Sequence, residues 1–561
     1  MNAPTLRPYQ RDAIAAVVAA RKRGVRRQVI SLPTGSGKTV IFSRLASLAR
    51  HPVLVLAHRA ELLEQARAKL EAAGVTPVEI EQGSRHASPS ARAVVASIRS
   101  LGDARLARLL GRWQPRLVIY DECHHAPAED NLRVLEGLGV FDEDWPGTLV
   151  GFTATTSRGD GVGLDRVFDE VVFEQPLPDL ISDGYLVGLR GFRIATSSDL
   201  RSLASGDGAS GDPRQRVSDF ELEALAEAVD VTERNALVAR SIQELARDRR
   251  TIVFCVNVAH AKSLAKALRE TGVRAAPVHG QLDAEERKHR LADFSSGKLQ
   301  AITNVAVLTE GFDDPGVSCV AMARPIRSSG LYAQCVGRGT RLAPGKKDCL
   351  VLDFVDLGGL SLITLPTLYG IPHQLDLEGR PISEVAAVWR QLEVDFPDFE
   401  LGPDAITLEE IQQRAAAFDP VSLRVDPEVR AISPHAWASL GSSGLALHIW
   451  RGSRPRTYCV LATPGRGRRW RVTLEGKEKA RFSTPEEAVE AVDYEVERLG
   501  PKVAQSALHE ANWRQSSPPR ALLEDLAERA PGRPPQPTWG GALVLSALLD
   551  AREARRERSR S

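Results

Sequence analysis

The sequence lacks the features that mark zinc-binding, secreted and membrane-spanning proteins. Only six of the 561 residues are cysteine, and no two of them form a CxxC pair, so neither a zinc ribbon nor a thiol redox motif is expected. No uninterrupted apolar run is long enough to cross a bilayer. The opening segment MNAPTLRPYQ has no basic patch followed by an apolar stretch, unlike a signal peptide. We therefore expect a cytoplasmic protein with no membrane partner.

The chain also lacks a strong net charge of either sign. Lys and Arg total 73, Asp and Glu total 72, and the formal net charge is +1. Global charge therefore gives no indication for or against nucleic acid, and any electrostatic footprint must be local. Hydrophobic residues make up 43% and charged residues 26% of the chain, which is typical of a folded protein. Because 561 residues are too many for one compact core, we expect three or four domains.

What the sequence does have is an alternation of short β-rich runs with amphipathic helical segments. Such alternation predicts βαβ units and parallel sheets that are buried on both faces. A Ser-, Gly- and Asp-rich stretch at 196–216 separates two such halves and is predicted to be a flexible insertion or linker. The candidate strands of the first half are RQVISL (27–32), PVLVLAH (52–58), ARAVVAS (91–97), RLVIYDE (116–122) and TLVGFTAT (148–155). Those of the second half are RTIVFCV (250–256), VRAAPVH (273–279), LQAITNV (299–305), VSCVAMA (317–323) and DCLVLDF (348–354).

The segment LPTGSGKT (32–39) follows a candidate strand and opens a candidate helix. Gly35 and Gly37 let the chain turn tightly enough for backbone N–H groups to face a phosphate. Lys38 is placed to reach the terminal phosphates of a nucleotide, and the Thr39 hydroxyl to hold Mg²⁺. The helix N-terminus adds its positive dipole end. The pattern usually has Gly or Ala at its first position, where this chain has Leu, and a chance glycine turn is the alternative for the motif taken alone.

The run LVIYDECHH (117–125) brings two adjacent carboxylates to the end of a candidate buried strand. Asp121 fits a magnesium-holding role and Glu122 a water-activating role. A lone Asp-Glu pair is usually a solvated turn. Because this pair follows both a phosphate loop and a buried strand, the catalytic interpretation is favoured.

The segment QCVGRGTR (334–341) carries two arginines three residues apart. Guanidinium groups supplied from a second domain would stabilise the charge that builds on a transferred phosphoryl group. This reasoning assigns Arg338 and Arg341 to the catalytic set. Taken alone, such a pair is more often part of a salt-bridged surface.

Read in order, these segments resemble the superfamily 2 helicases, the broad DEAD/DEAH-box grouping, over about residues 5–355. LRPYQ (6–10) is similar to the adenine-sensing segment, with Gln10 the matching glutamine. LPTGSGKT matches motif I, and DECH (121–124) matches motif II. The remaining matches are TAT (153–155) to motif III, TN (303–304) and EGFD (310–313) to motif V, and QCVGRGTR (334–341) to motif VI.

The resemblance implies an α/β fold of two tandem RecA-like parallel-sheet domains, with ATP and Mg²⁺ bound in the cleft between them. His124 would link the catalytic strand to motif VI or have a plain packing role, and the neighbouring His125 could simply be solvated. The implied catalytic set is Glu122, Lys38, Arg338, Arg341 and Gln334. The implied nucleotide-binding set is Gln10, Thr34, Gly35, Ser36, Gly37, Lys38, Thr39, Asp121 and Asp313, with Thr39 and Asp121 as the Mg²⁺ ligands.

Finer details are similar to the RadD/XPB-like branch, which also includes restriction-enzyme motor subunits and acts on DNA. The segments that carry this similarity are AHRAELLEQA (57–66), VVASIRSL (94–101), GFTATTSRGDG (151–161) and VLTEGFDDP (307–315). By this resemblance Arg59 and Ser97 fall where family members touch the nucleic-acid backbone. The branch commonly has Gln where this chain has Arg99, so that contact is open. RadD-type proteins have a cysteine-rich zinc module, whereas this chain has only Cys459 after residue 349, so no zinc is expected.

After about residue 370 the pattern changes. Residues 445–483 contain four short strand candidates, which a predicted helix follows, and this predicts a small α+β module. Its arginines interleave with Trp450, Tyr458 and Trp470, so it is either a single-strand binding platform or a small core beneath a solvated basic face. Those arginines are Arg451, Arg454, Arg456, Arg466, Arg468, Arg469 and Arg471. The expected division is 1–190 RecA-like domain 1, 191–230 linker, 231–370 RecA-like domain 2, 371–440 helical linker region, 441–500 accessory α+β module and 501–561 helical segment with a basic tail.

We therefore expect an ATP-dependent DNA helicase or translocase that acts on single-stranded or branched DNA, in DNA repair. Two alternatives stay open at this stage. One is an RNA helicase, and the other is a nucleic-acid-binding scaffold in which ATP acts only as a conformational switch. Glu122 and the two arginines of motif VI argue against the scaffold. A nuclease-linked restriction motor is disfavoured because the C-terminal region has no convincing PD…ExK-like cluster.

Overall fold

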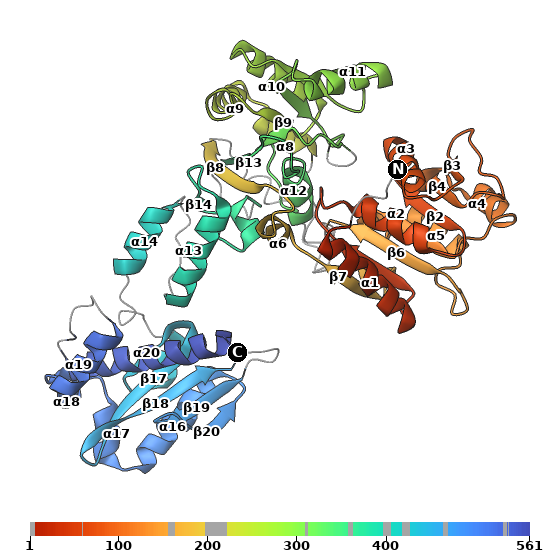
Figure 1. Cartoon of the computed structure of the whole chain (residues 1–561). Helices are drawn as coiled ribbons and strands as arrows, with labels where there is room; N and C mark the ends of the chain where they lie inside the picture. The colour runs from red at the N-terminus through yellow and green to blue at the C-terminus, as the bar shows by residue number, and fades with distance from the viewer. Residues whose placement is uncertain are drawn as a thin grey trace. The chain divides into compact units, whose positions relative to one another are not determined.

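The computed structural model divides the chain into two compact units (Figure 1). The first unit runs to Ala386 and also takes in β15 (Ile406–Thr407), and the second unit takes the rest of the chain. Each unit is described by itself. The structure describes residues 6–58, 60–154, 163–196, 222–308, 312–356, 363–395, 406–417, 427–463, 469–530, 536 and 538–560.

The first sheet of the first unit has seven parallel strands in the order β3-β4-β2-β5-β6-β1-β7. Its central strands are nearly continuous runs of Val, Ile, Leu and Ala because both faces of the sheet are covered. The strands are β1 (Arg27–Ser31), β2 (Val53–Ala57), β3 (Val78–Glu81), β4 (Ala93–Ser97), β5 (Leu117–Asp121), β6 (Thr148–Thr153) and β7 (Glu170–Glu174). The main helices are α1 (Pro8–Lys22), α2 (Lys38–Leu48), α3 (Ala60–Ala72), α4 (Asp103–Leu110) and α5 (Glu129–Gly137).

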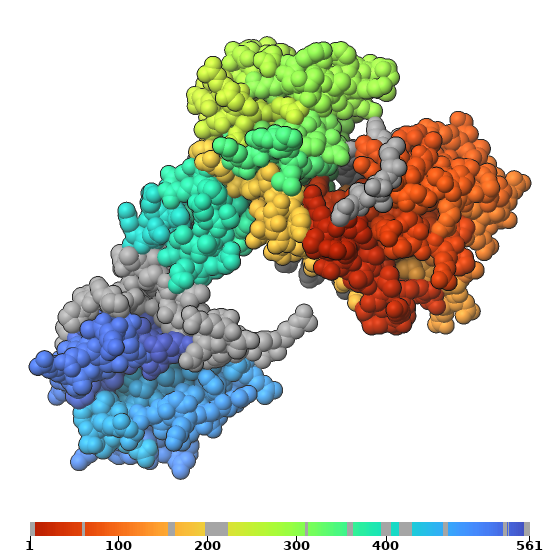
Figure 2. Space-filling model, viewed as in Figure 1, coloured from red at the N-terminus to blue at the C-terminus, as the bar shows by residue number. Residues whose placement is uncertain are grey.

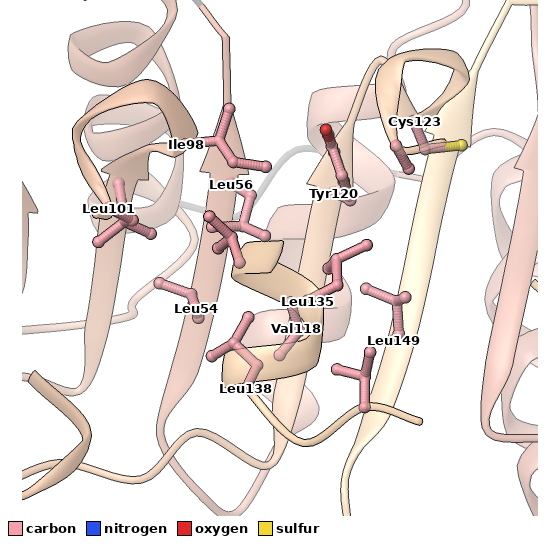
Figure 3. Close-up of a cluster of buried hydrophobic side chains, with 14 of the residues drawn as sticks. Leu54, Leu56, Ile98, Leu101, Val118, Tyr120, Cys123, Leu135, Leu138 and Leu149 are labelled. Carbon is pink, nitrogen blue, oxygen red and sulfur yellow. The ribbon is translucent and has the colours of Figure 1, made fainter. Parts of the chain in front are cut away.

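One core cluster of this sheet packs beneath the site described below (Figure 3). Leu54, Val118 and Leu149 come from three neighbouring strands, and Leu135 comes from α5. Figure 3 shows the hydroxyl group of Tyr120 directed away from Leu135. The ring of Tyr120 therefore packs in the core, while its hydroxyl group lies toward the carboxyl edge of the sheet.

The second sheet of the first unit has six parallel strands in the order β10-β11-β9-β12-β13-β8. In Figure 2 its residues (yellow to green) and those of the first sheet (red to orange) form distinct packed bodies. The strands are β8 (Gly188–Thr196), β9 (Arg250–Phe254), β10 (Ala275–Val278), β11 (Ala301–Asn304), β12 (Val317–Met322) and β13 (Asp348–Asp356). The helices are α6 (Leu177–Ser182), which precedes β8, and α8 (Leu222–Val229), α9 (Thr232–Leu245), α10 (Val258–Glu270), α11 (Ala284–Ser295) and α12 (Ser329–Val336).

These two sheets confirm the predicted α/β class with tandem parallel-sheet domains. All ten candidate strands are present, and three more strands, β3, β7 and β8, complete the sheets. Strand β8 pairs with β13 from Gly188 to Thr196, so it belongs to the second sheet although the boundary between domains was expected at residue 190. Most of the stretch expected to be a flexible linker, 196–216, lies outside the described residues.

The second unit contains a five-stranded antiparallel sheet in which each strand pairs with the next along the chain. Side chains alternate along β17: Leu445 and Leu447 face a core with Val492 of α16, whereas Ala446 packs with Leu548 of α20. The sheet is therefore covered by helices on both faces. Its strands are β16 (Trp437–Ser439), β17 (Gly444–Arg451), β18 (Arg454–Ala462), β19 (Trp470–Leu474) and β20 (Lys477–Phe482).

The helices of the second unit confirm a C-terminal α+β region. Two of them, α13 (Ile382–Asp395), which begins in the first unit, and α14 (Leu408–Ala417), fall within the helical region expected at 371–440. The others are α15 (Pro427–Ile432), α16 (Pro485–Arg498), α17 (Pro501–Ala507), α18 (Asn512–Gln515), α19 (Arg520–Arg529) and α20 (Trp539–Arg560). Among the described helices, none has the length and apolarity that a bilayer crossing needs.

Candidate nucleotide and nucleic-acid site

The glycine turn between β1 and α2 is held in the conformation that a phosphate loop needs. Gly35 has φ +85° and Gly37 has φ +80°, both in the left-handed region that favours glycine. Helix α2 begins at Lys38, with Gly37 as its N-cap residue. A Cβ atom on Gly37 would lie 2.8 Å from Nε2 of Gln10, so this position also leaves room for a neighbouring side chain.

Residues at the start of α1 form hydrogen bonds with the backbone of this loop. The Nε2 atom of Gln10 donates a hydrogen bond to the carbonyl oxygen of Ser36 at 3.2 Å, and the hydroxyl group of Tyr9 donates to the same oxygen. Gln10 is itself fixed by the backbone N–H of Arg7, which donates to Oε1 at 3.0 Å. Burial raises the pKa of Tyr9, so its hydroxyl group stays a donor. The sequence pointed to Gln10 but not to Tyr9, although the two are adjacent.

The acidic pair lies at the carboxyl end of β5, next to the loop. Oε1 of Glu122 lies 3.1 Å from Nζ of Lys38, and both side chains are about 10% exposed (10% and 11%). Asp121 ends the strand, and its Oδ1 accepts a hydrogen bond from the backbone N–H of Glu122 at 3.1 Å. Glu122 has φ +53°, a left-handed conformation that is unusual for a residue with a side chain. Strained backbone of this kind concentrates at functional sites.

His124 lies between the acidic pair and β6. Its Nδ1 atom is 3.5 Å from Oε2 of Glu122 and 3.3 Å from Oγ1 of Thr153. The structure therefore brings together residues from motifs II and III of the implied helicase pattern. Cys123, between Glu122 and His124, is buried, and burial raises the pKa of its thiol well above the ordinary value. That thiol is an inert core group.

The arginine segment that follows α12 packs on the same loop. A Cβ atom on Gly337 would lie 2.7 Å from Cβ of Thr34, and one on Gly35 would lie 3.1 Å from Cγ of Arg341. Residues of the second sheet's domain thus contact the glycine turn of the first. Only glycine at 35 and 337 allows this approach without displacing a neighbour.

Both arginines are oriented by the segment that precedes β12. Arg338 donates to the carbonyl oxygen of Phe312 at 2.7 Å, and Arg341 donates to the same oxygen at 3.1 Å. Arg341 also lies 2.9 Å from Oδ1 of Asp313. Burial lowers the pKa of Arg341, which nevertheless remains charged because an arginine titrates far above neutrality. Gln334 is buried within α12, one turn before Arg338.

Family models match both sheet domains. The model of the type III restriction enzyme res subunit matches residues 3–158. The model of the helicase conserved C-terminal domain matches residues 233–343. Both matched domains are those of the superfamily 2 helicases, and the chain resembles these helicases over its two sheet domains.

Curated relatives of this chain include proteins from yeasts and bacteria. A Schizosaccharomyces pombe protein named as a mitochondrial ATP-dependent helicase, irc3, is 36% identical over 378 residues, which cover 65% of this chain and 60% of the relative. The Saccharomyces cerevisiae protein named as an ATP-dependent helicase, IRC3, is 29% identical over 408 residues, 69% of this chain and 57% of the relative. The EcoAI type I restriction enzyme endonuclease subunit of Escherichia coli is 25% identical over 375 residues, 62% of this chain and 46% of the relative. The chain spans less than two thirds of each relative's length.

A pocket of 940 Å³ in the first unit lies at the carboxyl edge of the first sheet. His58, Arg99 and His125 line it from the first sheet's domain, and Arg287 of α11 lines it from the second. Ser97, expected to touch a nucleic-acid backbone, is buried at the end of β4. Arg59, expected in the same role, lies outside the described residues, as do Thr155, Glu310 and Gly311 of the matched motifs.

In the segment of the second unit that is rich in arginine and aromatic residues, the aromatic side chains described below pack within the unit, which favours a small core over a platform for single-stranded nucleic acid. Tyr458 is fully buried in the core of the sheet, so it cannot stack on a base. Trp450 packs with Trp513 and Trp539, at ring-centroid distances of 5.8 and 5.2 Å. Arg454 and Arg456 both form ion pairs with Glu475. Arg451 and Arg469 are exposed, and Arg466 and Arg468 lie outside the described residues.

Proposed function

We propose that this helicase hydrolyses ATP to move on, or remodel, single-stranded or branched DNA. The observation that carries the proposal is the contact of Gly337 and Arg341 with the glycine turn at Thr34 and Gly35. Phosphate-binding and charge-stabilising groups from two domains meet there, as phosphoryl transfer requires.

In this proposal the residues around the turn have distinct roles. Lys38 and the backbone of residues 34–37 bind the phosphates, and Glu122 orients and activates the attacking water. Arg338 and Arg341 stabilise the charge on the transferred phosphoryl group. Asp313 orients Arg341, and Gln334 packs within the segment that carries both arginines. Gln10 holds the phosphate loop through its hydrogen bond to Ser36.

The residues present fit a magnesium ion. Mg²⁺ prefers oxygen ligands, and the Thr39 hydroxyl follows Lys38 while the Asp121 carboxylate precedes Glu122, the two partners of a 3.1 Å ion pair. The ion would neutralise phosphate charge. No group of three or more His, Cys, Asp or Glu side chains suited to a metal is found in the described part of the chain, and the absence of zinc stays a prediction.

Coupling to DNA would follow from the two-domain site. Because Arg338 and Arg341 complete the site only when the domains meet, closure both assembles the catalytic groups and changes the grip on the strand. Contacts to phosphates carry no sequence information, so binding should be general and sensitive to salt. A role in DNA repair and a cytoplasmic location stay predictions.

Turnover of ATP with matched nucleic acids tests the proposal. The full chain is assayed without nucleic acid, then with single-stranded, duplex and forked DNA, and with RNA of matched sequence. The proposal expects stimulation that is largest with single-stranded or forked DNA. Stimulation by RNA alone would make the protein an RNA helicase, and binding without turnover would make it an ATP-switched scaffold.

A further inference from the structure

Three histidine rings form a row of tilted and edge-to-face contacts from the acidic pair to the 940 Å³ pocket. The rings of His124 and His125 have centroids 4.1 Å apart, and those of His125 and His58 have centroids 4.5 Å apart. Nε2 of His58 lies within hydrogen-bond distance, 3.1 Å, of the Tyr120 hydroxyl group. Tyr120 directly precedes Asp121, so the chain of contacts returns to the acidic pair.

One end of this row of rings contacts the residue proposed to activate water. Nδ1 of His124 is 3.5 Å from Oε2 of Glu122, while Oε1 of the same carboxylate is held by Lys38. The backbone joins the two ends of the turn as well, because the N–H of His125 donates to the carbonyl oxygen of Glu122 at 3.1 Å. A displacement of His125 therefore reaches Glu122 by two routes, through the rings and through the main chain.

The other end of the row of rings lines the pocket. His58 and His125 both contribute to its wall, beside Arg99 and opposite Arg287. His58 follows β2 and His125 follows β5, two neighbouring strands of the sheet, so the contact joins two separate loops. The carbonyl oxygen of His125 accepts a hydrogen bond from Nδ2 of Asn131 at 2.7 Å, which ties the turn to α5.

We propose that His58 and His125 are positioning residues that transmit occupation of this pocket to Glu122. A nucleic-acid strand seated against their rings would press the row of rings toward His124 and favour the pairing of Glu122 Oε2 with His124 over the pairing of Oε1 with Lys38. Lys38 would then be released for phosphate, and Oε1 of Glu122 for water. This inference rests on the proposed function and assigns the coupling to residues outside the catalytic set.

Transmission by ring contact requires a planar ring at position 125. A phenylalanine at 125 keeps a planar ring between the two neighbours, whereas alanine removes it. If the rings transmit the signal by contact, His125→Phe retains coupling and His125→Ala loses it. His58→Ala removes the ring at the pocket end and should resemble His125→Ala. His51→Ala, which removes an exposed imidazole of the same domain, is the matched control.

Steady-state ATP hydrolysis by the full chain, titrated with an oligothymidine strand, gives the maximal stimulated rate and the half-saturating DNA concentration. We expect His125→Ala and His58→Ala to lower the maximal rate about five-fold, the scale of a coupling change near 1 kcal/mol. The half-saturating concentration should move by less than about two-fold, and His125→Phe and His51→Ala should match the wild type in the maximal rate.

Three results would overturn the inference alone: an undiminished maximal rate in both alanine variants, a change confined to the half-saturating concentration, or equal damage by His125→Phe and His125→Ala. The last result would indicate a structural or imidazole-specific role. If the wild-type chain itself hydrolyses ATP without any response to nucleic acid, the proposed function and this inference both fail. Two alanine variants on separate loops keep the test informative if one of them does not fold.

Discussion

Nζ of Lys38 lies 3.1 Å from Oε1 of Glu122, with both side chains almost withdrawn from solvent. The proposed function gives these groups different partners during hydrolysis, a phosphate for Lys38 and a water molecule for Glu122. Their ion pair gives each of these two largely buried charged groups a partner of opposite charge. It also places the two groups within reach of the same phosphoryl group.

Removing either partner of this pair should abolish turnover in different ways. Lys38→Ala should lose ATP binding and leave Glu122 buried without its cation, which costs about 3 kcal/mol of stability. Glu122→Gln keeps an oxygen acceptor for Lys38, so ATP binding should survive while hydrolysis falls by at least about 100-fold. Fluorescent-nucleotide binding and phosphate release on single-stranded DNA measure the two effects. Full hydrolysis by either variant would remove these residues from the site.

Two glycine-to-alanine variants can separate the effect of backbone strain on ATP binding from the effect of a steric clash. Gly37→Ala places a Cβ atom 2.8 Å from Nε2 of Gln10, whereas Gly24→Ala has the same kind of left-handed backbone, φ +93°, with nothing within 4 Å. Both variants should lose about 1 kcal/mol of stability. Only Gly37→Ala should weaken ATP binding, because it displaces the side chain that holds the carbonyl of Ser36. Equal ATP affinity in the two variants would contradict the assigned role of Gln10.

The exposed arginines of the second unit are the remaining candidates for an accessory DNA grip. The double variant Arg451→Ala, Arg469→Ala should reduce the slope of log affinity against log salt concentration by about 1 to 2, if each arginine contacts a phosphate. Arg520→Ala, an exposed arginine on α19 of the same unit, is the control. An unchanged slope in the double variant would restrict DNA contacts to the first unit.

His448 should make the second unit sensitive to acid. Burial, with Arg514 nearby, lowers the pKa of His448 to about 3 from its ordinary 6.5. The unfolded chain therefore takes up the proton more readily, and the stability from neutral His448 is present above pH 6.5 and lost as the pH falls toward 3. The loss should approach about 1.4 kcal/mol per pH unit in that window. Urea unfolding of wild type and His448→Asn measures it, and parallel pH profiles would refute it.

Much of the fold could be predicted because its central strands carry their own signal. Runs such as VLVLA in β2 are apolar throughout, since both faces of a parallel sheet are buried. The strands β3 (VEIE) and β7 (EVVFE) lie at the two edges of the first sheet. Glutamate alternates with apolar residues in β3 and stands at both ends of β7, which weakens that signal. Strand β8 could not be assigned to the second sheet because its pairing with β13 is a long-range contact.

The individual motifs of the site could be predicted from the sequence, whereas the contacts between distant segments could not. The spacing of LPTGSGKT and the Asp121-Glu122 pair pointed to phosphate chemistry because few other functions need those residues together. The approach of Gly337 to Thr34 depends on how two domains pack, which no local pattern encodes. The contact of His58 with His125 arises only because β2 and β5 are neighbours in the sheet.

The most direct test of the account is single-turnover ATP hydrolysis on single-stranded DNA by Arg341→Ala, compared with Arg240→Ala, an exposed arginine on α9 of the same domain. If Arg341 reaches across to the phosphate loop, Arg341→Ala should lose about a thousand-fold in rate while ATP binding persists, and Arg240→Ala should match the wild type. A wild-type rate in Arg341→Ala would show that its contact with Gly35 serves packing alone and would contradict an ATP site shared by the two domains.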